Sequence, residues 1–248
     1  MQFDQIIREL EQTRTLPVDA LRKAQINRDL ITPELLRVIE RYIAADSNTR
    51  SRPNAVFFAF HLLGSWRAKS AYPLLATFLR QNPADLEDVL GDAITATSHR
   101  VMACVFDGDP GPLYGIITDT GADEFIRSRM CEALAMVVLQ GDLPKSEAGR
   151  FLQRGFSEIK PIRNCQVWVG WKNAIAMLGL SELTPLVREA YERHSIDEAL
   201  GTFQQFEEED MAFDGRGAQR HPSWMQNEYT PFGDIVEELS AWQQFRKP

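Results

Sequence analysis

Five prolines recur along the 248-residue chain at an interval that constrains its fold: Pro33, Pro73, Pro112, Pro144 and Pro185. The gaps between them are 40, 39, 32 and 41 residues. Each stands just before or within the start of a segment whose apolar residues have helical spacing. Proline suits a first helical turn, because its missing N–H would be unpaired there and its φ is already helical. A helix start that recurs at this interval predicts a repeated helix pair.

Two kinds of helical segment alternate along the chain. Residues 56–66 and 165–178 are apolar on nearly every side, which is typical of helices buried between neighbours. Other segments, such as residues 35–43, carry a single apolar face. No strand-like alternation lasts for more than a few residues. The sequence therefore predicts an all-α, right-handed superhelical array over residues 1–200, an α-solenoid of about five helix pairs.

The last part of the chain, residues 201–248, has a different composition. It contains an acidic run at 207–210 and is rich in aromatic residues, namely Phe203, Phe206, Phe213, Trp224, Tyr229, Phe232, Trp242 and Phe245. We expect a non-repeat arm that ends in a helix over residues 230–245. Because terminal repeats need a cap, we expect the arm to dock on the last helix pair, against Leu183, Leu186, Val187 and Tyr191. The alternative is a free acidic and aromatic segment.

Composition limits the class of protein. A hydrophobic content of 44% is enough for a continuous core. The longest apolar run, residues 133–139, is far shorter than the ~20 residues of a membrane span. The first residues lack the basic and apolar regions of a signal peptide, so we expect a cytoplasmic protein with no membrane partner. Three cysteines in apolar helical segments predict buried, reduced thiols: Cys104, Cys131 and Cys165.

The net charge of −8 is unevenly distributed. Residues 1–172 hold 21 basic and 21 acidic side chains, whereas residues 173–248 hold 6 basic and 14 acidic ones. Between Ser47 and Ala84 there is no acidic residue but there are five basic ones: Arg50, Arg52, Arg67, Lys69 and Arg80. This segment is a candidate anion or partner surface if its cations converge. The alternative is a solvated face that lacks acids.

Catalytic and metal-binding motifs are not found in the sequence. It has no Gly-rich phosphate loop, no G-x-S-x-G elbow and no H-E-x-x-H pair. The four histidines are far apart and lack a ligand partner at metal-binding spacing. We therefore predict no catalytic residue, cofactor or metal site, and we leave open whether any acidic residue is catalytic. Trp168 and Trp171, three residues apart on one helix side, are either core residues or a binding hot spot.

One stretch of the chain resembles a HEAT repeat. It comprises Pro-Leu-Tyr-Gly-Ile-Ile at 112–117, Asp-Glu-Phe-Ile-Arg at 123–127 and Ala-Leu-Ala at 133–135. In that pattern a proline-led helix and an acidic turn precede a second helix with an early basic residue. Asp92 and Arg100 match the same pattern more weakly. The whole chain also resembles a family of uncharacterised bacterial proteins with HEAT-like helices, classed as a domain of unknown function. The resemblance implies stacked helices and transfers no catalytic residue.

Two functions are compatible with these observations. The first is a protein-interaction scaffold or adaptor that uses the surface of a short helical array, with another protein as its partner. The alternative is a HEAT-like enzyme, or a module that binds nucleic acid or anions through the basic residues of 47–84. Nucleic-acid binding needs several cations to displace counterions from phosphates, and the overall acidity argues against it. Neither the partner nor the oligomeric state follows from the sequence.

Overall fold

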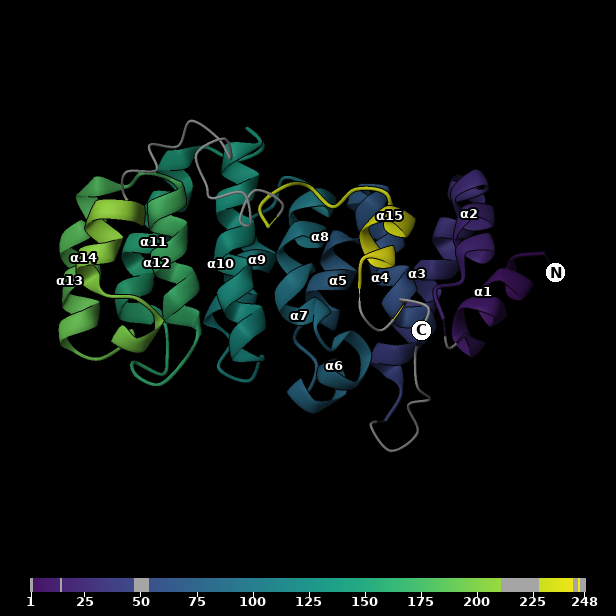
Figure 1. Cartoon of the computed structure of the whole chain (residues 1–248), viewed down its shortest axis with the longest axis horizontal. Helices are drawn as coiled ribbons and strands as arrows, with labels where there is room; N and C mark the ends of the chain where they lie inside the picture. The colour runs from purple at the N-terminus through teal and green to yellow at the C-terminus, as the bar shows by residue number, and fades with distance from the viewer. Residues whose placement is uncertain (1, 14, 47–53, 211–227, 243–244, 246–248) are drawn as a thin grey trace.

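The computed structural model describes residues 2–13, 15–46, 54–210, 228–242 and 245. Within these ranges the fold is all-helical and contains no strand, which confirms the predicted class. The helices follow one another along the long axis of the molecule, with the N-terminal helices at one end and α13 and α14 at the other (Figure 1).

Four mostly buried helices pack on one another in chain order and form a first row. They are α4 (Asn54–Ser65), α8 (Ser98–Val105), α10 (Glu124–Leu139) and α12 (Val167–Met177). All eight residues of α8 are buried, and α10 is buried along most of its length. Helices of this kind need neighbours on several sides, because their apolar side chains point in all directions.

A second row of amphipathic helices covers the first. It contains α3 (Arg28–Ala44), α5 (Tyr72–Phe78), α9 (Gly111–Thr118), α11 (Lys145–Glu158) and α13 (Thr184–Glu192). Each packs on the next, and α3, α5, α9 and α11 also contact the first-row helix that follows them in the chain. One face of each helix stays exposed. The alternation of buried and amphipathic helices that the sequence predicts is therefore present.

The five recurrent prolines all belong to this second row. Pro73, Pro112 and Pro185 each occupy the second position of a helix, and Pro144 directly precedes α11. Pro33 differs from the expected helix start, because α3 begins five residues earlier, at Arg28. The turn from Arg28 to Thr32 is nevertheless helical, with Leu30 and Ile31 bonded to the Asn27 carbonyl.

The remaining helices lie at the ends and between the rows. The N-terminal end is formed by α1 (Gln2–Gln12) and α2 (Val18–Ile26), and α6 (Pro83–Leu90) and α7 (Ala93–Ala96) connect α5 to α8. Short 3₁₀ turns span Lys69–Ala71, Ser181–Leu183 and Glu198–Leu200. After α14 (Phe203–Gln205), a π-helical turn, Phe206–Asp210, packs on α12. The last helix, α15 (Ile235–Ser240), is shorter than expected.

The expected docking of the C-terminal arm is correct for one part and wrong for the other. Phe203 contacts Tyr191, and Phe206 is fully buried, so this part caps the last helices. Residues 228–242 instead return to the N-terminal half, where α15 packs on α2 and α4 (Figure 1). There Phe232 and Trp242 cover the apolar face of α4, which would otherwise be exposed to water.

Helices α10 and α12 run side by side in the same direction. Glu124 accepts a hydrogen bond from the Gln166 backbone N–H, and about two turns further on Glu132 accepts one from Asn173. Between these contacts the helices approach so closely that a β-carbon placed on Gly170 would lie 2.1 Å from the Ser128 carbonyl oxygen. Only glycine permits this approach, since the clash would be with backbone.

We therefore expect Gly170→Ala to destabilise the protein by about 3 kcal/mol or more, because the two helices would have to separate. Gly149→Ala is the matched control, since a β-carbon there would meet only the Leu180 side chain, at 3.5 Å. That change should stabilise α11 by about 0.5–1 kcal/mol through helix propensity. Urea unfolding of both variants checks the difference. Equal effects at the two positions would contradict the close crossing.

Candidate functional site

The basic residues singled out in the sequence do not form one cluster among the described residues. Arg50 and Arg52 lie outside the part of the chain that the structure describes. Lys69 precedes α5 and Arg80 follows it, so these two lie at opposite ends of that helix. Arg80 is also paired with Asp119 at 2.6 Å, which neutralises its charge locally. Arg67 is exposed beyond the end of α4.

Trp168 and Trp171 belong to the core and not to an exposed surface. Both side chains are fully buried and pack edge to face, with ring centroids 5.5 Å apart. Their indole N–H groups donate to backbone carbonyls, those of Pro161 and Leu152, respectively. The hot-spot interpretation is therefore wrong, because neither ring is accessible to a partner.

The cysteines largely follow the prediction. Cys104 and Cys131 are buried, and burial raises the pKa of both thiols. Cys165 is only partly buried, because it lies just before α12 at the edge of a cleft. Burial raises the pKa of its thiol as well, and the charge of Glu124 adds to that effect. No metal-binding group of three or more His, Cys, Asp or Glu side chains occurs among the described residues.

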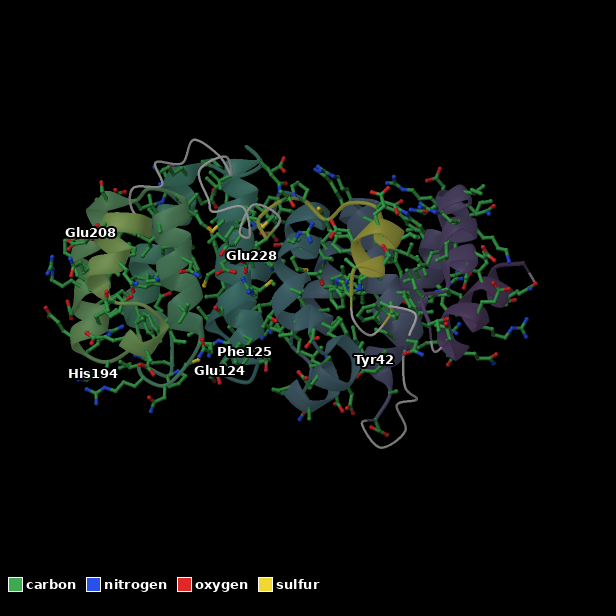
Figure 2. All side chains as sticks on the ribbon, in the orientation of Figure 1. Tyr42, Glu124, Phe125, His194, Glu208 and Glu228 are labelled. Carbon is green, nitrogen blue, oxygen red and sulfur yellow. The ribbon has the colours of Figure 1, made fainter. Side chains whose placement is uncertain are left out.

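A buried polar cluster ties the C-terminal segment to the first row of helices. Glu132 on α10 is 2% exposed and accepts hydrogen bonds from Arg129 at 2.6 Å and from Asn173 at 2.8 Å. The Tyr229 hydroxyl donates to the same carboxylate at 3.3 Å. Burial raises the pKa of Glu132, although Arg129 opposes this effect. Arg129 also pairs with Glu228, which lies over α10 (Figure 2).

The returning segment is also held by Arg100 on α8. Its guanidinium pairs with Glu238 at 2.6 Å and donates to the backbone carbonyl of Thr230 at 2.8 Å. Asp234, at the N-terminus of α15, accepts from Arg22 and Gln25 on α2, both at 2.7 Å. These contacts join residues 228–240 to α2 and α8, far from them in sequence.

Two buried histidines lie beneath this segment. His61 on α4 donates from Nδ1 to the Phe57 carbonyl, and its Nε2 accepts from the Thr97 hydroxyl. His99 donates from Nε2 to the Glu228 carbonyl. Burial lowers the pKa of His61 to about 4 and that of His99 to about 3. Both rings are therefore neutral in the folded protein at pH 7.

An open cleft of about 530 Å³ lies at the N-terminal ends of α10 and α12. Glu124 forms one wall, and residues 164–166 with Val169 form another. The third wall is the segment 194–200 after α13, without Ala199. Glu124, Phe125 and His194 lie along this edge of the molecule (Figure 2).

Two arginines hold the walls of the cleft in place. Arg127 is 1% exposed and donates to the carbonyls of Ile117 and Lys160, which fixes the loop before α12. Arg193 lies over the ring of Phe156 at 3.8 Å and donates to the Ser195 hydroxyl at 2.8 Å. The cleft is therefore built on ordered supports.

The backbone and the exposed side chains of the cleft set it apart from its surroundings. Asn164 and His194, which both line it, adopt left-handed backbone conformations, with φ of 56° and 59°. Such conformations in non-glycine residues occur frequently at functional sites. Leu200 in the lining is 51% exposed, and Phe125 beside Glu124 is 44% exposed. The cleft thus combines polar groups with the exposed apolar side chain of Leu200.

The sequence motifs do not predict this cleft. Asp123 and Glu124 match the acidic turn of a repeat, and Asp197, Glu198 and Leu200 belong to no motif. The sequence does contain a local signal, namely the acidic pair Asp197-Glu198 followed two residues later by Leu200 at the end of the predicted repeats. What makes these residues a site is that two loops and two helix ends meet there.

Arg100→Met tests the attachment of the C-terminal segment. Glu238 would be left partly buried without its cation, so we expect a loss of about 2–3 kcal/mol in the free energy of unfolding. Amide hydrogen exchange within residues 232–240 should increase in parallel. Arg37→Met is the control, because its pair with Glu34 is exposed and worth less than about 1 kcal/mol. Unchanged exchange in the Arg100 variant would contradict the attachment.

The histidines predict a pH dependence of stability. Between about pH 6.5 and pH 4 the unfolded chain binds protons at His61 and His99 and the folded chain does not, so stability decreases as pH falls. We expect a lower urea midpoint at pH 5 than at pH 7, with a slope of up to about 1.4 kcal/mol per pH unit for each histidine.

The paired variant His61→Gln/His99→Gln should lose most of this slope, whereas His194→Gln, which replaces an exposed histidine, should keep it. Glu132, whose pKa is raised, contributes a slope of the opposite sign, so the difference between the variants isolates the histidines. A wild-type slope that persists in the paired variant would contradict the assignment.

No helix in the described ranges is long and apolar enough to span a membrane.

No curated protein and no solved structure shows significant similarity to the chain. The model of one family, described as a protein of unknown function (DUF1186), matches residues 1–246. Because this match covers nearly the whole chain, the protein belongs to that family of unknown function.

Proposed function

We propose that the protein is a cytoplasmic interaction scaffold, built as a short right-handed solenoid of HEAT-like helix pairs. In this proposal it binds another protein through the cleft between α10, α12 and residues 194–200. The observation that carries this proposal is the cleft itself, with ordered walls and exposed apolar side chains at its edge. Protein-binding sites combine such apolar anchors with a polar rim.

The arrangement of the helices also supports the solenoid part of the proposal. In a helix-pair array, equivalent helices of successive units stack in parallel. The parallel register of α10 and α12, with α11 packed on both, is what this arrangement requires. Prolines at or directly before the starts of α5, α9, α11 and α13 give the same unit boundaries.

The proposal is tested with the full chain as an immobilised bait for proteins of its source organism, quantified by mass spectrometry. Leu200→Gln removes an exposed apolar side chain that lines the cleft, and Phe125→Gln removes the exposed residue next to the lining residue Glu124 in sequence. Leu139→Gln is the matched control, because Leu139 is 42% exposed at the opposite end of the helix that carries Phe125.

We expect proteins captured by the wild type to be captured equally by the Leu139 variant and about tenfold less by the cleft variants, since central apolar anchors contribute more than ~1.4 kcal/mol each. Circular dichroism and thermal melting check that all variants are folded. Equal capture by the three variants, or no capture above a column without bait, would refute binding through this cleft.

A further inference from the structure

The charged groups of the cleft are of one sign. Its lining contains three carboxylates, those of Glu124, Asp197 and Glu198, and no lysine or arginine. Arg127 donates to the carbonyls of Ile117 and Lys160 and to the Cys165 sulfur at 3.6 Å, and Arg193 lies over aromatic rings. Arg163, beside the cleft, donates to the Arg193 carbonyl at 2.7 Å. The carboxylates of the lining therefore have no lysine or arginine partner within the lining itself.

The three carboxylates differ in how they are engaged. Glu124 accepts from the Gln166 N–H, and Asp197 accepts from the Ala199 N–H, so each keeps further lone pairs available. Glu198 is exposed to solvent. Asp197 and Glu198 are adjacent, and Leu200 follows two residues later, so acidic and apolar groups alternate within one short wall.

We infer that the cleft binds an extended, basic segment of a partner protein; this inference rests on the function proposed above. Lysine or arginine side chains of the segment pair with Asp197, Glu198 and Glu124. An aliphatic side chain of the segment packs against Leu200 and Val169. Charge complementarity selects a cationic segment over an acidic one, because like charges at such short range are repulsive. The apolar contact supplies affinity that salt does not screen.

The probe is a short fluorescein-labelled peptide of alternating Lys-Lys and Leu-Leu pairs, which presents both residue types on each side of an extended chain. One reference peptide has glutamate in place of lysine, and another has serine in place of leucine. Fluorescence anisotropy with the full chain measures the dissociation constants at low and at physiological salt concentration.

The paired variant Asp197→Asn/Glu198→Gln removes two charges from the cleft and keeps the capping acceptor of Asp197. Glu87→Gln/Asp88→Asn is the matched control. These two acids are adjacent and exposed on α6 and line a different cleft, so the net charge changes equally.

We expect the lysine–leucine peptide to bind more tightly than both reference peptides. The cleft variant should weaken this binding by about three- to tenfold and the α6 variant should leave it unchanged, because each exposed ion pair contributes up to ~1 kcal/mol. Equal losses in the two variants would show general electrostatic attraction and overturn the inference. Tighter binding of the glutamate peptide, or no binding of any peptide, would also overturn it.

Failure here is separable from failure of the proposed function. If Leu200→Gln loses captured proteins but the basic peptide is not preferred, the cleft is an interface for a partner of different chemistry. If Leu200→Gln captures the same proteins as the wild type, the interface itself is wrong. Self-association through the cleft would appear in sedimentation as a dimer that the Leu200 variant loses.

Discussion

The close crossing of α10 and α12 is the constraint on which most of the structure depends. At Gly170 the two backbones approach to a separation that no side chain allows, and this fixes both the distance and the register of the helices. The register brings Glu124 to the N-terminus of α12, where its carboxylate satisfies an otherwise unpaired N–H. It also brings Asn173 to the buried Glu132. One glycine thus determines a helix pair, a buried carboxylate site and an edge of the cleft.

Burial of charge joins the C-terminal segment to the first row of helices. Arg100 and Glu132 lie in the first row of helices, where an unpaired charge would cost several kcal/mol. Their partners come from the C-terminal segment: Glu238 for Arg100, and Tyr229 with Glu228 for Glu132 and its companion Arg129. The segment therefore does more than cover apolar surface. Because it supplies the carboxylate that pairs with Arg100, detaching it would leave that guanidinium buried without its counterion.

The cleft contrasts with this buried cluster. In the cluster, carboxylates are enclosed and paired with arginines of the same protein, so they contribute to structure. In the cleft, three carboxylates are accessible, and the nearby arginines donate to backbone carbonyls. Carboxylates that have no cationic partner within the lining are available to a cation from outside the chain. This difference in pairing is the reason why we place the interaction surface at the cleft.

The sequence by itself determined the fold class and the alternation of buried and amphipathic helices, because helical periodicity and proline act locally. Prolines at 73, 112, 144 and 185 marked helix starts correctly, whereas Pro33 did not. The turn before Pro33 is helical because Leu30 and Ile31 donate to the Asn27 carbonyl. Only the tertiary structure decided where residues 228–242 bind, because Glu238 is 138 residues from Arg100 and Tyr229 is 97 residues from Glu132 in sequence. It also decided that Trp168 and Trp171 are core residues and that Glu124, Asp197 and Leu200 share a cleft. Those relationships depend on which helix ends and loops contact one another in space, and the periodicity of the sequence does not specify such contacts.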